Sequence, residues 1–386
     1  MQSVNFVSKT NAWEQWKLSD LAYKINRFNA NESVKIPLTV SAQHGLVAQL
    51  SFFKNQVMGK NISKYQVIHK GEFSYNKSPS EGFPFGVVRR LNNYEKGLLS
   101  PVYVIFGVHE DKVNSDFLSI IFNTYEWNKN LAPNIKKGAR ILLNISDNDF
   151  FNVNLTAPST QVEQENIAKL IYKLDSLITL HQRKFLNLKN LKSRLLDIMF
   201  CDEKSQFPSI RFKEFTNAWE QWKVGDLITE RIEFTKESNE FPLMAFVANE
   251  GVVAKGERYD RSSLVRDIYN KIYKVTKYGD FIYSSNNLDR GSIGANKYGN
   301  ACISPVYSIF KCTNSSDHNF IKNILSRHSF VNKLLKYRQG VVYGQLKIHE
   351  SIFLNINLNS PSILEQNKIG KIFYNLDSLI TLHQRG

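Results

Sequence analysis

The chain has 386 residues, of which 42% are hydrophobic and 12% aromatic, and this is enough material for two domains with sizeable cores. A formal net charge of +15 favours a polyanionic partner such as nucleic acid over a generally basic protein or a membrane-surface binder. Three cysteines without CxxC spacing indicate neither a disulfide framework nor a zinc site. With no signal segment and no long apolar run, the sequence predicts a cytoplasmic protein in a reducing compartment.

An eight-residue block near the N-terminus is repeated in the second half of the chain. Thr10 to Lys17 reads TNAWEQWK, and the same letters return from Thr216 to Lys223. The block marks the start of a whole-domain duplication. Its tryptophans could stack on bases, but they are identical in both copies and could not help the two copies to read different sites. We therefore predict that they pack against helix ends.

Between the repeated blocks, the two copies have largely different sequences. Short matches persist, such as Gly71–Phe73 with Gly279–Phe281, whereas residues 52–65 and 256–273 share almost nothing. Each copy therefore has a repeated frame around a divergent middle.

Inside the divergent middles, short β-rich runs alternate with Gly, Asn and Ser turns and with one or two short helices. We expect strands at Val102–Phe106 and Phe281–Tyr283, and helices at Asp116–Asn123 and Phe320–Lys333. The predicted fold class is α+β, with two tandem domains.

A long uninterrupted helix is predicted in the middle of the chain, from Gln161 to Phe200. Apolar residues recur there in steps of three and four or their sums, close to a heptad, without Gly or Pro. Leu174 to Arg183 reads LDSLITLHQR, and Leu376 to Arg385 repeats it letter for letter. We predict that the two helices pair as an antiparallel coiled coil and make the duplication pseudo-two-fold. The expected seam residues are Ile167, Ile171, Leu174, Ile178, Phe185, Leu188, Leu195, Ile369, Ile372, Leu376 and Leu379.

Polar residues at the helices have structural interpretations. His181 and its copy His383 fall on the seam side, where we expect them to fix the register of the pair and not to bind metal. Glu163, Glu165 and Glu365 lie near helix starts, where the positive end of the helix dipole favours acidic side chains.

Basic and amide residues collect in the loops of the divergent middles. Arg and Lys can bind phosphates or guanine, and Asn and Gln can pair with adenine, although any one of these residues can also be a solvated surface charge. The candidate DNA-contacting residues are Lys60, Asn61, Lys64, Asn76, Lys77, Ser78, Arg89 and Arg90 in the first copy, and Arg258, Arg261, Arg266, Ser285, Asn286, Asn287, Arg290, Lys297 and Tyr298 in the second.

Sequence patterns for catalysis are absent. There is no Walker A loop and no Asn-Pro-Pro-aromatic or Asp-Pro-Pro-Tyr block for amino methylation. The nearest Gly-containing turn, Gly291 to Gly294, is explained by the backbone freedom of glycine. We expect no catalytic residue, no metal and no cofactor in this chain.

Taken together, the repeated blocks resemble those of the specificity subunits of type I restriction-modification enzymes. The motifs are the FTNAWEQWK entry at Phe215–Lys223, the GDFIY and SPVY blocks, and the Glu-Gln helix opening followed by LDSLITLHQR. The resemblance implies two target-recognition domains, at residues 1–157 and 208–360, each reading half of a bipartite asymmetric DNA site. It also implies a central helix at 158–207 that sets the spacer and a second helix at 361–386.

The resemblance further implies a set of partners. These are double-stranded DNA, two modification (methyltransferase) subunits and restriction (motor and nuclease) subunits. S-adenosylmethionine, ATP and Mg are then expected on the partner subunits. The alternatives are a stand-alone DNA-binding or scaffolding protein dimerised through its coiled coil, and the recognition half of a fused restriction-modification polypeptide.

One departure from the family concerns the helices. The second helix stops at Arg385, whereas the first continues to Phe200, so it is shorter than the second helix of the family. This leaves open whether Phe185–Met199 pairs within the chain or with another subunit or copy.

Overall fold

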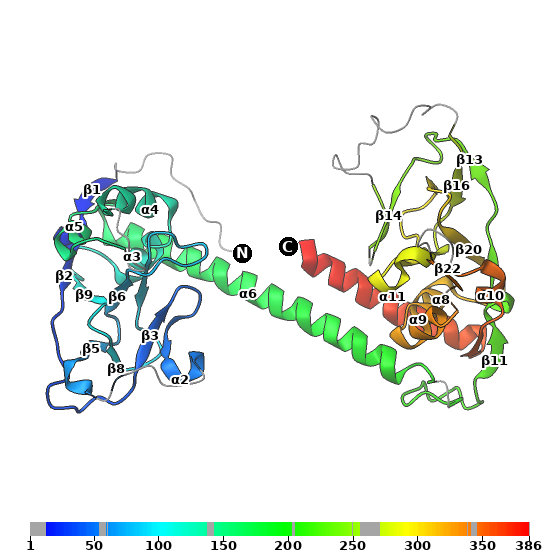
Figure 1. Cartoon of the computed structure of the whole chain (residues 1–386), viewed down its shortest axis with the longest axis horizontal. Coiled ribbons are helices and arrows are strands. Elements are labelled where there is room, and N and C mark those ends of the chain that lie inside the picture. Colours follow the sequence, from blue (N-terminus) through cyan, green and yellow to red (C-terminus); the bar gives the residue numbers. More distant parts are fainter. Residues whose placement is uncertain are drawn as a thin grey trace. The chain divides into compact units, whose positions relative to one another are not determined.

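The computed structural model describes residues 13–53, 59, 61–136, 143–202, 205–248, 250–254, 271–337, 339–340 and 346–385. The chain divides into two compact units, Met1–Leu177 (unit 1) and Ile178–Gly386 (unit 2). Each unit mixes helices and strands around its own buried core, so the fold class is α+β (Figure 1). One long helix, α6 (Gln161–Ile198), spans the boundary between the units.

Unit 1 is built around a four-stranded antiparallel sheet in the order β2-β9-β6-β7. Two further strand pairs, β5-β8 and β3-β4, complete its β structure. The strands are β2 (Ala22–Lys24), β3 (Leu38–Ser41), β4 (Gly45–Ala48), β5 (Gln66–His69), β6 (Phe73–Asn76), β7 (Val87–Arg90), β8 (Lys96–Leu99) and β9 (Val104–Val108).

Unit 2 has a four-stranded sheet with the same strand arrangement, in the order β12-β20-β17-β18. In both sheets the first strand along the chain lies at one edge, beside the last. The strands of unit 2, inside and outside this sheet, are β12 (Ile228–Glu230), β13 (Phe234–Thr235), β14 (Ala245–Val247), β15 (Gly251–Val253), β16 (Tyr273–Thr276), β17 (Phe281–Tyr283), β18 (Ile293–Ala295), β19 (Ala301–Ile303), β20 (Ser308–Cys312), β21 (Gln339–Gly340) and β22 (Leu346–Lys347). The divergent sequences therefore fold in the same way.

Short helices pack against both sheets. In unit 1 they are α1 (Leu18–Leu21), α2 (Gln49–Phe52), η1 (Ile62–Lys64), α3 (Ser115–Ile121), α4 (Tyr125–Leu131), η2 (Ala132–Asn134) and α5 (Asp147–Phe151). In unit 2 they are α7 (Val224–Leu227), η5 (Ser285–Arg290), α8 (His318–Leu325), α9 (His328–Leu335) and α10 (Glu350–Leu354).

The helix predicted at Phe320–Lys333 is two helices, and that prediction was wrong. Helix α8 ends at Leu325, and Arg327 takes an extended backbone conformation with ψ near 142° before α9 begins. The apolar period continues across the break, so the sequence pattern did not reveal it.

The repeated Gly-acid-Phe blocks form the same turn in both units. Gly71 and Gly279 have positive φ angles of 87° and 85°, which glycine adopts at low cost. The carboxylate that follows accepts the backbone N–H of the residue three positions earlier, at 2.7 Å in both units. It also accepts two hydrogen bonds from an arginine, from Arg27 to Glu72 and from Arg231 to Asp280. The block therefore fixes the turn and the edge of each sheet.

The repeated WEQWK block forms an entry strand that pairs with the strand before each long helix. β1 (Glu14–Lys17) pairs with β10 (Asn154–Ala157), and β11 (Glu220–Lys223) pairs with β23 (Asn357–Ser360), in the same register. Trp219, just before β11, is buried beside Phe320 of α8, which confirms a packing role for that tryptophan.

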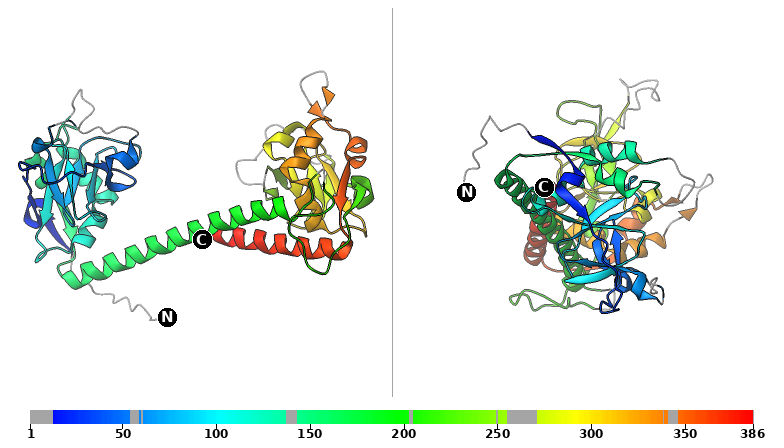
Figure 2. Two further views of the ribbon diagram at one scale, coloured as in Figure 1. Left: turned by 90° about the horizontal axis from the view of Figure 1, so that it is seen from below. Right: turned by 90° about the vertical axis from the view of Figure 1, so that its left-hand side faces the viewer.

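Within unit 2, the C-terminal part of α6 lies beside α11 (Ile363–Arg385), as the left view of Figure 2 shows. His181 Nδ1 lies 3.0 Å from His383 Nδ1, and Lys192 Nζ lies 2.6 Å from Asp377 Oδ1. From the first pair to the second, residue numbers rise along α6 and fall along α11. The two helices therefore run antiparallel here.

The predicted seam residues of this part of the chain lie on the core of unit 2. Those in the core or packed against it are Leu188, Leu195, Ile369, Ile372 and Leu376. Phe185 is half-buried, with the Lys189 ammonium 4.5 Å from its ring centroid, and Leu379 is exposed. Phe185–Met199 therefore packs within the chain, which answers the question that the sequence left open.

The earlier part of α6 has a different environment. Ile167 packs on the core of unit 1 and Ile171 lines a pocket there, but Leu174 and Ile178 are exposed. No described residue covers these two positions of the predicted seam.

Candidate nucleic-acid interface

Four of the candidate DNA-contacting residues, Lys60, Arg258, Arg261 and Arg266, lie outside the described residues. The side chains of Asn286 and Asn287 lie outside them too, although their backbone belongs to η5. The remaining candidates divide into side chains that bind their own unit and side chains that are open to solvent.

In unit 1, two candidates stabilise loop conformations. The Asn61 side chain caps η1 by accepting the Ser63 N–H at 3.2 Å. Asn76 accepts the Ser78 N–H at 2.9 Å and donates to the Val40 carbonyl at 3.1 Å. These contacts hold the backbone of the two loops, and Lys64 is exposed at the end of η1.

Lys77 binds within unit 1. Its ammonium donates to the Ile145 carbonyl at 2.9 Å and to Asp147 at 3.1 Å. Asp147 also pairs with Lys24 at 2.6 Å. Burial would raise the pKa of Asp147, but the hydrogen bonds and charges of the two lysines outweigh it and lower that pKa. Lys77 thus ties the end of β6 to α5.

Arg89 and Arg90 at the end of β7 also bind groups of unit 1. Arg89 donates to the Val88 and Ala42 carbonyls and, at 2.7 Å, to Asn123, and burial lowers its pKa. Arg90 binds Ser115 at 2.9 Å and pairs with Asp116 at 2.5 Å. Both guanidinium groups have several partners in the fold, and a contact with DNA would have to replace some of them.

In unit 2 the candidates are more open. Arg290 at the end of η5 and Tyr298 in the β18–β19 loop are exposed. Lys297 is half-exposed and pairs with Asp377 at 3.1 Å. Ser285 donates to the Ile348 carbonyl at 3.5 Å. Exposed cations at the tips of loops can bind phosphates, and an exposed tyrosine beside them can stack on a base.

Lys297 belongs to a lysine cluster that the sequence did not reveal. Lys192 of α6 and Lys322 of α8 bind the same Asp377 carboxylate. Burial lowers the pKa of Lys322 to about 8. Burial alone would raise the pKa of Asp377, but Lys322, Lys192 and Lys297 outweigh it and hold that pKa well below its usual range. Three cations share one carboxylate, so the cluster carries excess positive charge.

Groups suited to catalysis do not gather in the part of the chain that the structure describes. No three His, Cys, Asp or Glu side chains of these residues lie together as metal ligands would. Burial raises the pKa of Cys201 to about 12 and that of Cys312 to about 11, so both are thiols at neutral pH and weak nucleophiles. No helix among the described residues is long and apolar enough to cross a membrane.

The fold and the exposed cations define an α+β protein suited to binding nucleic acid. Residues 217–386 match the family model of the type I restriction modification DNA specificity domain. This match over the second half of the chain confirms the resemblance. No curated protein matches the sequence.

Three solved structures are similar to the chain, each at 13% sequence identity. One is the type I restriction-modification system S subunit from M. genitalium, with a TM-score of 0.56 over 99% of this chain and 93% of that chain. Another is the HsdS subunit from Thermoanaerobacter tengcongensis, with a TM-score of 0.46 over 97% and 91%. The third, from a study of complex assembly and conformational transition of the type I R-M system, has a TM-score of 0.46 over 98% and 95%. At this identity, the likeness to the M. genitalium S subunit shows a shared fold.

Proposed function

We propose that the chain is the DNA-recognition subunit of a type I restriction-modification complex. In this proposal each unit reads one half of a bipartite asymmetric site and the chain has no catalysis of its own. The observation that carries the proposal is the same strand order in two units with divergent loops, one of which matches the DNA specificity domain. Two different surfaces on one scaffold suit two different half-sites.

The partners follow from the same proposal. Double-stranded DNA binds the loops, two modification subunits dock on the long helices, and restriction subunits join them. S-adenosylmethionine, ATP and Mg bind the partner subunits, which carry out methylation and cleavage. The net charge of +15 supports a DNA partner, because cations that neutralise phosphates release counterions.

Methylome mapping tests this function. In cells that express the chain with its modification subunit, we expect adenine methylation at one bipartite sequence with an unmethylated spacer. A tagged chain should also co-purify the modification subunit from its host. If the tagged chain binds DNA but never brings down a modification subunit, a stand-alone DNA-binding or scaffolding protein replaces the proposal.

We also propose that α6 sets the spacer. Its 38 residues give a length of about 57 Å at a rise of 1.5 Å per residue. Four residues inserted after Lys173, where α6 is exposed, add about 6 Å and about 400°, which is only some 40° past a full turn. The spacer should grow by one or two base pairs while both half-sites keep their sequence, since base pairs rise about 3.4 Å.

A two-residue insertion at the same site is the control. It rotates the helix by about 200° and should abolish methylation. An active four-residue variant with an unchanged spacer, read by methylome mapping, would rule out the helix as the ruler.

A further inference from the structure

Three lysine side chains of unit 2 converge on one carboxylate. The ammonium of Lys192, on α6, lies 2.6 Å from Asp377 Oδ1, and that of Lys297, in the β18–β19 loop, lies 3.1 Å from Asp377 Oδ2. Lys322 of α8 binds the same Oδ2 oxygen. Among the described residues, Asp377 is the only carboxylate that pairs with any of these lysines, so three positive charges face one negative charge.

The three ammonium groups also have more hydrogen-bond donors than the protein supplies acceptors. Each ammonium has three N–H donors. In the part of the chain that the structure describes, each of the three lysines donates once, to Asp377. The shortage matters most for Lys322, whose side chain is only 15% exposed, because a buried charge is costly unless it is fully hydrogen-bonded. The cluster therefore lacks acceptor atoms as well as negative charge.

Rigid elements hold the three lysines in place. Helices α6, α8 and α11 contribute side chains to one core. The loop of Lys297 is fixed by the buried Asn296, which accepts the backbone N–H of Tyr298 at 2.8 Å. A ligand that binds here meets donors that are already positioned, which lowers the entropic cost of binding.

The equivalent place in unit 1 lacks these cations. Counted from the N-cap residues of α3 and α8, Ser119 stands where Lys322 stands in unit 2. Counted from the pairing of β6 with β7 and of β17 with β18, Asn92 stands where Lys297 stands. Asp175, the copy of the shared carboxylate, is exposed and forms no ion pair with a described residue. The excess positive charge is therefore specific to unit 2.

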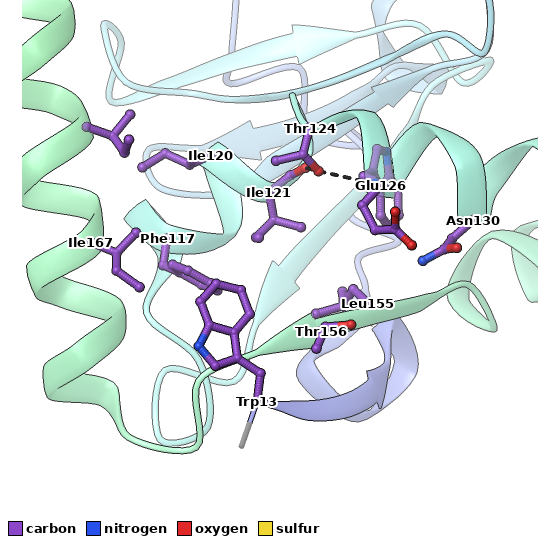
Figure 3. Close-up of a pocket in the computed structure, with 12 residues that line it drawn as sticks. Trp13, Phe117, Ile120, Ile121, Thr124, Glu126, Asn130, Leu155, Thr156 and Ile167 are labelled. Carbon is purple, nitrogen blue, oxygen red and sulfur yellow. Dashed lines mark hydrogen bonds between the residues drawn. The ribbon is translucent and has the colours of Figure 1, made fainter. Parts of the chain in front are cut away.

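Apolar side chains occupy the space between α3 and α6 in unit 1. A pocket of about 260 Å³ lies there, and Phe117, Ile120 and Ile167 line it (Figure 3). An anion in this pocket would lose its hydration without gaining charged hydrogen-bond donors, which is unfavourable. Only unit 2 offers an environment suited to an anion at this position.

We propose that Lys192, Lys297 and Lys322 form a binding site for a phosphate oxyanion. Lys297 and Lys322 contact the same oxygen of Asp377, so their ammonium groups lie close enough for one phosphate to accept hydrogen bonds from both. The phosphate belongs either to a free anion or to the backbone of duplex DNA, since both sources offer the same oxygens. Two of the three lysines stand on helices, outside the loops proposed to read the half-sites.

Inorganic phosphate tests the site in the full-length chain. At constant ionic strength, its phosphorus NMR resonance should broaden saturably. Lys297→Gln should weaken phosphate binding about fivefold, and Lys192→Gln combined with Lys297→Gln about twentyfold, because each change removes one charge next to the anion. Lys371→Gln removes an exposed lysine of α11 and is the matched control, which should leave the affinity unchanged. Equal weakening by the control would mean that phosphate responds only to net charge, and would overturn the proposal.

A change at the carboxylate should act in the opposite direction. Asp377→Asn removes the only negative charge of the cluster, so phosphate should bind about fivefold more tightly. Its melting temperature should fall in chloride and rise more than that of the parent chain when phosphate replaces chloride. If Asp377→Asn binds phosphate no better than the parent, the lysines serve only to neutralise Asp377 and the proposal is wrong. The lysine variants decide the matter if this variant does not fold.

Duplex DNA distinguishes the two sources of the phosphate. If the DNA backbone occupies the site, inorganic phosphate should compete with DNA, and the double lysine variant should reduce the salt slope of DNA affinity by about 1. If a free anion occupies it, the salt slope should stay that of the parent while phosphate affinity falls. Parent phosphate affinity in the double variant would contradict the site for either source. The phosphate measurement needs no modification subunit, so the site and the proposed function can fail separately.

Discussion

Units 1 and 2 share their frame but differ in how completely that frame is buried. In both, the glutamine of the Glu-Gln helix opening accepts the backbone N–H of an N-cap residue, Gln164 from Asn114 before α3 and Gln366 from Asp317 before α8. Unit 2 adds a part-buried ion pair between Arg211 and Glu365, while at the equivalent carboxylate of unit 1, Glu163, the described residues show an exposed hydrogen bond from Trp13. Identical sequence blocks thus contribute differently to the stability of the two units, because different residues pack on them.

The largest difference in stability between the units is expected on replacing the two equivalent tryptophans, Trp13 and Trp219. Trp219→Ala should destabilise unit 2 by about 3 to 5 kcal/mol, because it leaves a cavity beside Phe200. Trp13→Ala should cost about 1 kcal/mol, because this indole is already partly solvated. Native-state hydrogen exchange in β17 and β6 measures the two losses separately. Equal losses would mean that the pocket in unit 1 is closed in solution.

The arginine–carboxylate pair of the turn in unit 2 should likewise contribute more to stability than the equivalent pair in unit 1. Arg231 and Asp280 are buried, so Asp280→Asn removes the buried carboxylate that accepts two hydrogen bonds from Arg231, leaves this arginine with the exposed Glu233, and should cost about 3 kcal/mol. Arg27 is more open to solvent, and Glu72→Gln should cost about 1 kcal/mol. Urea unfolding of each variant checks both values. A larger loss for Glu72→Gln than for Asp280→Asn would reverse the comparison.

Exposed and bound arginines should respond differently to neutralisation. Arg290→Ala should weaken DNA binding by about 1 kcal/mol, reduce the salt slope by about 1 and leave stability unchanged. Arg90→Ala should instead destabilise unit 1 by about 1.5 to 3 kcal/mol, since it removes hydrogen bonds to a charged group. Titrations at two salt concentrations, with thermal unfolding as the control, separate the two effects. Unchanged DNA affinity in the Arg290 variant would make it a solvated surface charge.

The helical parts of the fold were predictable because their signal is local. The apolar period gave the long helix from Gln161, and α6 ends within two residues of the predicted Phe200. The order of the strands could not be predicted, because pairing joins residues far apart, as between Phe73 and Phe106. The break between α8 and α9 was missed because both helices have the same apolar spacing.

The candidate interface was predictable only by residue type. The sequence identified loops rich in Arg, Lys and Asn, but it could not say that Arg90 binds Asp116 or that Lys77 reaches Asp147. The lysines around Asp377 come from three separate elements, and no spacing connects them. Tertiary contacts therefore decide which cations remain available for DNA.

Exchange of residues 20–150 for the equivalent segment of a relative tests the central claim most directly. Both units keep their frame in this experiment, and only the divergent middle of unit 1 changes. Methylome mapping should show one half of the bipartite site altered and the other half and the spacer unchanged. A swap that alters both halves of the site, or neither, would contradict the claim that the two units read DNA independently.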